Sequence, residues 1–182
     1  NATRLTLWIH PGRIKTGVNL HEKEGPVLHP GRRYTLFIPP DIEDAQGSPL
    51  HKAHSKTFLA GPPDHDQPRP GKWMIEPPRA GSLDPLRVQL DEPLDHALLL
   101  RMLTIQSPSG GVVDGSAKVL NQETLWTFLP IEPWQAERHR IAIDAEIEDP
   151  AGNTPARVFD TDLRLPSPGS PTLRIPFTPT TP

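Results

Sequence analysis

Proline restricts the possible folds of this chain more than any other residue. It occupies 25 of 182 positions, against about 5% of the residues of an average protein. Pro lacks a backbone hydrogen-bond donor and clashes with the preceding turn inside a helix, so a chain this rich in Pro cannot form a helix bundle. Short clusters of Trp, Ile, Leu and Val between the prolines supply enough apolar surface for a core. We therefore expect an all-β protein.

Charge and Cys content exclude several classes of function. The formal net charge is −3, whereas a nucleic-acid-binding protein needs a basic surface. Cys is absent, which excludes disulfides, thiolate catalysis and Cys-ligated zinc. The longest apolar run, 97–100, is too short to span a membrane. Residues 1–2 resemble a tag-cleavage scar and the chain does not begin with Met, so we expect the natural N-terminus and any signal sequence to lie outside it.

Residues 72–163 carry the densest series of strand signals. Period-2 alternation and turn residues predict strands at 73–78, 85–90, 103–107, 111–120, 124–130, 138–147 and 156–163. The stretch 96–103 predicts a short connecting helix with Leu98 and Met102 on one face. About seven strands within some ninety residues is the spacing of a β-sandwich.

The flanking regions are simpler. Strands are predicted at 4–11, 32–40 and 55–61. The second of these strands places Tyr34, Leu36 and Ile38 on one face. Residues 62–71, rich in Pro, Asp and Gly, predict a linker. Residues 164–182 predict a Pro-rich extended tail, and the letters TLRIPF inside it predict an edge strand.

The sequence of one predicted turn occurs twice in the chain. IEDAQGSPL at 42–50 returns 105 residues later as IEDPAGNTP at 147–155, and the same shift places Tyr34 over His139. LTLWIHP in the first half also matches TLWTFLP in the second at a shift of 119, so the first copy carries an insertion. Residues 3–61 thus match only the second half of 72–163. We expect an array of modules whose first member is N-terminally truncated.

Four motifs also resemble, in the same order, those of bacterial Ig-like domains of the surface-layer-protein type. They are PLRVQLDEPLDHALL at 85–99, GGVVDGSAKV at 110–119, LWTFLPIEPW at 125–134 and HRIAIDAEIEDPAGN at 139–153. The chain is also similar to uncharacterised envelope proteins of planctomycete-like bacteria with two such modules. The resemblance implies a complete Ig-like sandwich at 72–163 and a partial Ig-like module at 3–61. Such modules are spacers or binding platforms as a rule, and fold alone does not fix function. The sequence departs from the family in two ways: the first module lacks its front half and carries the insertion, and Trp73, Trp126 and Trp134 make it richer in aromatic residues. Within the last motif, His139 stands where the family usually has Tyr.

The repeated turn could bind calcium, because carboxylates lie beside a Gly in both copies. The groups are Asp44, Gly47 and Ser48 in the first copy, and Asp149, Gly152 and Asn153 in the second. Ca²⁺ takes about six to eight oxygens, and each turn offers only a few. The favoured interpretation is a turn in which the Asp side chain accepts backbone N–H groups and Gly takes a positive φ. We predict no metal site here.

Two His clusters could ligate zinc. His51 and His54 are spaced as His-x-x-His, and His65 lies between Asp64 and Asp66. Both clusters fall in predicted loops, which seldom hold ligands with the accuracy a metal needs. We interpret both as solvated loops.

Paired carboxylates at Asp91, Glu92 and Asp95 suggest a glycosidase. That chemistry needs one carboxyl group in an apolar pocket and its partner across a gap, which neighbouring turn residues do not provide. We predict instead that Asp95 caps the helix at 96–103. The chain has no G-x-S-x-G motif and no Gly-rich phosphate loop. We predict no catalytic residue and no cofactor.

Four Trp residues have two interpretations. Trp8, Trp73, Trp126 and Trp134 fill the core or a module junction in the favoured one. In the other they form a sugar-stacking surface with Trp134 as its anchor, because Trp134 follows Pro133 at a turn.

Together these features predict a non-catalytic module outside the cytoplasm, in the periplasm, on the cell surface or secreted, that spaces or assembles a bacterial envelope structure. The alternatives are a carbohydrate-binding module and a calcium-stabilised, adhesin-like array. The expected partners are a protein or a surface glycan. A half-module leaves open strand edges, so we expect residues 3–61 to be covered by the tail 171–178, by the second module or by another chain.

Overall fold

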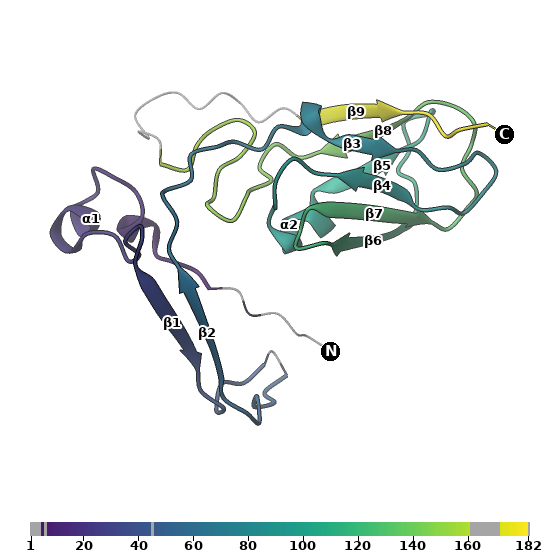
Figure 1. Cartoon of the computed structure of the whole chain (residues 1–182). Coiled ribbons are helices and arrows are strands. Elements are labelled where there is room, and N and C mark those ends of the chain that lie inside the picture. The colour runs from purple at the N-terminus through teal and green to yellow at the C-terminus, as the bar shows by residue number, and fades with distance from the viewer. Residues whose placement is uncertain (1–4, 6, 45, 161–171, 182) are drawn as a thin grey trace. The chain divides into compact units, whose positions relative to one another are not determined.

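Most regular structure in the chain is β. The computed structural model describes residues 5, 7–44, 46–160 and 172–181. In these residues nine strands form three antiparallel sheets (Figure 1), which confirms the all-β class. The chain divides into two units, Asn1–Asp64 and His65–Pro182. The division falls inside the segment 62–71 that the sequence predicts to be a linker.

The first unit contains one β-hairpin. A 3₁₀ helix, η1 (Pro11–Arg13), and a short helix, α1 (Asn19–Glu24), precede the antiparallel strands β1 (Arg33–Ile38) and β2 (His54–Leu59). The predicted strand at 4–11 is wrong, because its described residues pair with no strand. The chain turns into η1 instead, where the His10 side chain accepts a hydrogen bond from the Gly12 N–H.

Little of this unit is buried. Tyr34, Leu36 and Ile38 share a half-buried face of β1, as predicted, and Tyr34 stacks on Phe58 with ring centroids 5.9 Å apart. The prediction that Trp8 fills a core is wrong, since Trp8 is 85% exposed. Among the described residues of the unit only Gly12 and Ala60 are buried.

Two sheets build the second unit. The four-stranded sheet has the order β3 (Met74–Glu76), β4 (Leu86–Gln89), β7 (Leu125–Pro130), β6 (Gly115–Leu120). The three-stranded sheet has the order β5 (Leu103–Gln106), β8 (His139–Ile143), β9 (Leu173–Phe177). The 3₁₀ helix η2 (Pro70–Lys72) precedes β3, and the helix α2 (His96–Arg101) connects β4 with β5. As predicted, Asp95 caps α2, and its carboxylate accepts a hydrogen bond from the Leu98 N–H at 2.9 Å.

One apolar core joins the two sheets. Inward and outward residues alternate along β4 and β5, as a pleated strand with one buried face requires. The core cluster takes residues from both sheets, among them Leu86, Val88, Ile105, Trp126, Phe128, Ile141, Ile143 and Phe177. Trp73, Trp126 and Trp134 are buried, as predicted. The core therefore belongs to the second unit.

The strand β9 bears on two predictions. The strand expected at 156–163 is wrong over its described residues, because Thr154 forms a turn with Ala156 and Arg157; residues 161–163 lie outside the described residues. The predicted edge strand in the tail is confirmed as β9, which pairs with β8 from Ile143↔Leu173 to His139↔Phe177. One edge of β9 is used by β8, and the expectation that 171–178 covers the first unit stays a prediction. The expectations that the second module or another chain covers it stay predictions.

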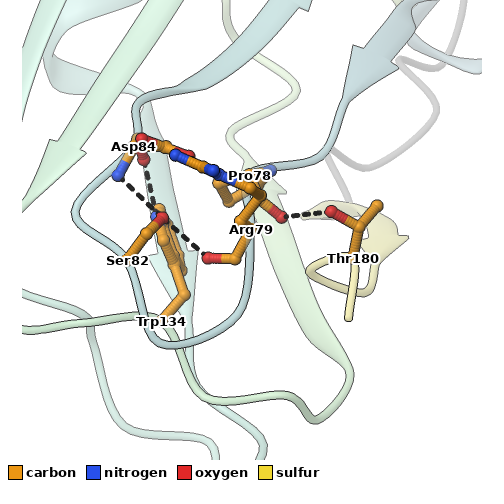
Figure 2. A network of polar contacts seen from close by, with 6 residues as sticks. All are labelled: Pro78, Arg79, Ser82, Asp84, Trp134 and Thr180. Carbon is orange, nitrogen blue, oxygen red and sulfur yellow. Dashed lines mark hydrogen bonds and ion pairs between the residues drawn. The ribbon is translucent and has the colours of Figure 1, made fainter. Parts of the chain in front are cut away.

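A second contact ties the end of the chain to the other sheet. The Thr180 N–H donates to the Pro78 carbonyl and the Ala80 N–H donates to the Thr180 carbonyl, both at 2.8 Å. Figure 2 shows Thr180 beside Pro78, just beyond β3, with a further hydrogen bond from its hydroxyl. The segment 172–181 therefore contacts both sheets of the second unit.

Candidate functional site

The first copy of the repeated turn is a closed hydrogen-bonded bend. The Asp44 carboxylate oxygen Oδ1 accepts from the backbone N–H groups of Gln46 and Ser48, both at 2.9 Å. The Gly47 N–H donates to the Asp44 carbonyl at 3.0 Å. Gly47 has φ +79°, a conformation that other residues adopt only with strain. The carboxylate is thus bound to the turn that carries it.

The second copy repeats the same bonds. Asp149 Oδ1 accepts from the N–H groups of Ala151 and Asn153 at 2.7 and 2.8 Å, and the Gly152 N–H donates to the Asp149 carbonyl. Gly152 has φ +87°. The Asn153 side-chain amide also donates to Asp149 Oδ2 at 2.8 Å, and Asn153 Oδ1 accepts from the Phe159 N–H. The prediction of capped turns with Gly at positive φ is confirmed in both copies.

These bonds limit what the turns can do chemically. Both oxygens of Asp149 already accept hydrogen bonds, and both Asp149 and Asn153 are buried. These bonds occupy part of the carboxylate, and the turn offers few of the six to eight oxygens that calcium takes. The calcium-stabilised array stays an alternative, which a calcium-dependent rise in melting temperature would support.

Glu148, beside the second turn, has a perturbed acidity. Burial raises the pKa of the Glu148 carboxyl above its ordinary value, and the negative charges of Glu146, Asp95 and Asp149 raise it further. The positive charge of Arg157 acts in the opposite direction on the same pKa. Glu148 is half-buried and its pKa shift has local causes, so we assign it no catalytic role.

The predicted His clusters lie on exposed chain. His51 is in a bend with φ +57°, and His54 begins β2 opposite Ile38. Both His side chains are exposed. Asp64, His65 and Asp66 are exposed too, at the division between the two units.

The predicted carboxylate cluster has structural partners. Asp91 accepts a hydrogen bond from the Trp73 indole N–H at 3.0 Å and another from the Arg69 backbone N–H at 3.2 Å. Asp95 caps α2. These two carboxylates hold a core Trp and a helix end, which is a different task from acid–base chemistry.

Trp134 is not a sugar platform. It is 3% exposed, and its indole N–H donates to the Asp84 carbonyl at 2.8 Å, as Figure 2 shows. Its ring makes edge contacts with His139 and Phe177 at centroid distances of 5.4 and 5.6 Å. The alternative interpretation, with Trp134 as an exposed glycan anchor, is therefore contradicted, and the favoured interpretation of a core Trp is confirmed.

An exposed ion pair lies on the loop that receives Trp134. Arg79 Nε is 2.7 Å from Asp84 Oδ2, and Figure 2 places both beside Ser82. The hydrogen bond from Arg79 lowers the pKa of Asp84, and the same bond raises the pKa of Arg79. Ser82 links the two ends of the loop by donating to the Arg79 carbonyl and accepting from the Asp84 N–H. We interpret this network as a clamp on the loop.

Two features were missed by sequence reasoning. The first is the exposed apolar surface of the hairpin, where Phe37 and Leu59 are 63% and 62% exposed. The alternation of 32–40 was a signal for it, since Phe37 falls on the face opposite Tyr34. The second is a cavity of about 240 Å³ beside His139 in the second unit, which had no signal in the sequence because its lining comes from distant loops.

No model of a known protein family matches the chain, and a search of curated proteins also finds no match. Among the described residues, the helices are too short and too polar to cross a membrane. The resemblance to bacterial Ig-like domains therefore rests on the sequence motifs alone.

Proposed function

We propose that this protein is a non-catalytic structural module of a bacterial envelope, outside the cytoplasm, and that it assembles through its first unit. We further propose that residues 72–163, completed by β9, form an Ig-like β-sandwich. The shared core of the two antiparallel sheets supports this, because sandwiches bury the inner faces of two sheets against each other. The four ordered sequence motifs support it independently.

The observation that carries the assembling role is the hairpin of the first unit. A two-stranded hairpin is at best marginally stable alone in water. Here the described residues bury little around it, and Phe37 and Leu59 are exposed at opposite ends of one face, with the Thr35–Thr57 pair between them. Within the described sheets β1 and β2 pair only with each other, so each has an open edge that can accept a further strand. Association with a second copy would cover both features.

Light scattering at increasing protein concentration tests this role. We expect the wild-type mass to rise above the 20.2 kDa of one chain. Phe37→Lys should keep the mass at that of one chain, because it replaces an exposed aromatic ring with a charge. Leu120→Lys is the matched control, because Leu120 is an exposed apolar residue on the edge strand β6 of the other unit. A wild-type protein that stays at one chain throughout, or an equal effect of both variants, would contradict self-association.

The location outside the cytoplasm needs its own test. Cells that produce the full-length protein can be fractionated, and the protein detected with an antibody raised against this chain. We expect it in the envelope or the secreted fraction. Recovery with the cytoplasmic enzymes would remove the envelope part of the proposal and leave the assembling role in place.

A further inference from the structure

We propose that the cavity beside His139 binds a primary ammonium group at the end of a short aliphatic chain, the chemistry of a Lys side chain. This site goes beyond the assembling role proposed above and belongs to the second unit alone. It is defined by six residues, His139, Trp134, Asp114, Glu132, Val112 and Ile131, which all line the cavity.

His139 supplies a buried hydrogen-bond acceptor. Its side chain is 2% exposed, and its Nδ1 is 2.8 Å from the Glu137 carbonyl oxygen. A carbonyl can only accept, so Nδ1 carries the proton and Nε2 of the neutral ring keeps a lone pair. Among the described residues Nε2 has no hydrogen-bond partner, and it is not one of the fully buried atoms that lack a partner. His139 lines the cavity, and we infer that Nε2 is the ring atom that a donor in the cavity meets.

The His139 ring is also fixed in place. It stacks on Phe177 at 5.5 Å with an interplanar angle of 28°, and the edge of Trp134 meets it at 5.4 Å. Phe177 and His139 are paired residues of β9 and β8, so the ladder keeps the two rings together, and Trp134 confines the His139 ring from another side. A fixed acceptor makes a better binding group, since less side-chain freedom is lost when a ligand arrives.

Charge decides which donor fits. Asp114 and Glu132 line the cavity, whereas no Lys or Arg is found among the described residues of its lining. The Ile131 N–H donates to the Asp114 carbonyl at 3.0 Å, which holds the chain segments of the two carboxylates side by side. Two carboxylates and the lone pair of Nε2 favour a cation that also donates hydrogen bonds, and a primary ammonium group has three donors.

The apolar rim decides what the ammonium group is attached to. Val112 and Ile131 line the cavity and are largely exposed, so they can pack against methylene groups. Lys packs its aliphatic stem on apolar surface while its charged end reaches polar groups. The cavity volume of about 240 Å³ lies below the roughly 300 Å³ at which sites for drug-sized ligands begin. A single side chain therefore suits it.

NMR of the full chain tests the site through the His139 ring itself. The probe is Nα-acetyl-lysine methylamide, and the matched neutral probe is the same compound acetylated on Nε. We expect the lysine probe to shift the ¹⁵N resonance of His139 Nε2 saturably, because that atom begins to accept a hydrogen bond. The neutral probe should give less than a tenth of that affinity. n-Butylamine, as a third probe, shows whether the amine and its aliphatic chain bind without the backbone amides of lysine.

Two variants complete the test. Asp114→Asn combined with Glu132→Gln changes only exposed side chains and should weaken the lysine probe about tenfold or more, which corresponds to about 1.4 kcal/mol. Glu76→Gln, an exposed carboxylate on β3, should leave the affinity unchanged. No shift at His139 Nε2, equal shifts with the charged and neutral probes, or an unchanged affinity in the double variant would each overturn the proposal. None of these results bears on association through the hairpin, which is measured separately.

Discussion

The two copies of the repeated turn have the same hydrogen bonds and opposite surroundings. In both, the Asp carboxylate accepts two backbone N–H groups and a Gly at positive φ closes the bend. The first copy lies on exposed chain, and Ile42 at its start is 38% exposed. The second copy is built into the core cluster, and Ile147 at the equivalent position is 0% exposed.

This difference shows that the local sequence determines the bend, whereas the surrounding strands determine whether the bend is buried. The letters I-E-D with a Gly three residues after the Asp are enough to form the bend, because every bond in it joins near neighbours. Burial needs other strands. The second unit has seven described strands around one core, and the first has two. The same turn is therefore expected to matter to stability in one unit far more than in the other.

Replacing the Ile of each turn should give the largest contrast. Ile147→Ala removes fully buried methyl groups from the core and should cost about 2–5 kcal/mol of unfolding free energy, whereas Ile42→Ala should cost about 1 kcal/mol or less. Exchange of the Gly152 and Gly47 amide hydrogens measures both, because each amide donates to its own Asp carbonyl. Similar losses in the two units would show that the first turn is buried in solution.

Removing the capping carboxylate should give the next contrast. Asp149→Ala leaves the part-buried N–H of Ala151 and the buried N–H of Asn153 without acceptors, at about 1–3 kcal/mol for the buried group. Asp44→Ala exposes the equivalent groups to water and should cost about 0.5–1 kcal/mol, as a lost surface cap does. Urea unfolding followed by Trp fluorescence measures the first, and amide exchange at Gly47 measures the second. Asp149→Asn should retain part of the stability, because the Asn side-chain oxygen still accepts.

The predictions that succeeded depend on neighbours in sequence. The caps of Asp44, Asp149 and Asp95 were all predicted, since each joins residues within four positions of one another. The strands of both sheets around the core of the second unit were also predicted, because alternation is a local signal. Their pairing order and the sheet each one joins needed the structure.

The predictions that failed depend on distant residues. The alternative with an exposed Trp134 relied on its position after Pro133 at a turn, but the carbonyl of Asp84, fifty positions earlier, accepts a hydrogen bond from its indole N–H. The stretch 156–163 alternates like a strand, but the side chains of Asn153 and Thr154 accept the N–H groups of its first residues and bend the chain. The third strand of the β5-β8-β9 sheet comes instead from the tail, as β9. The cavity at His139 could not be predicted for the same reason.

Adding one methyl group to the Gly of each turn should give a smaller contrast. Both glycines have positive φ, so an Ala should cost about 1–2 kcal/mol at either position. At Gly152 the added Cβ would also lie 2.8 Å from the Phe159 ring, whereas at Gly47 its nearest neighbour is the Glu43 carboxylate at 3.9 Å. We therefore expect Gly152→Ala to lower stability more than Gly47→Ala, by urea unfolding and amide exchange respectively. Equal losses would mean that the Phe159 ring moves aside at little cost.

The Glu before each Asp should give the smallest contrast, and one that depends on pH. Burial raises the pKa of Glu148 in the folded protein above the ordinary value of 4.5. Between that value and the higher folded pKa, the folded state therefore binds more protons than the unfolded state. Stability must fall as pH rises through this window, and the loss is complete above the folded pKa.

Glu148→Gln removes the ionisation that causes this loss. The variant should be slightly more stable than the wild type at pH 7, with a smaller difference near pH 4, where the wild-type carboxyl is largely protonated. Glu43→Gln is the matched control, because Glu43 precedes Asp44 in the first turn and is exposed, and it should leave the melting curves of the second unit unchanged at both pH values. Thermal melts at pH 4 and pH 7 measure this. A Glu148→Gln protein that loses stability at pH 7 would show that the Glu148 charge is held by Arg157 more strongly than burial opposes it.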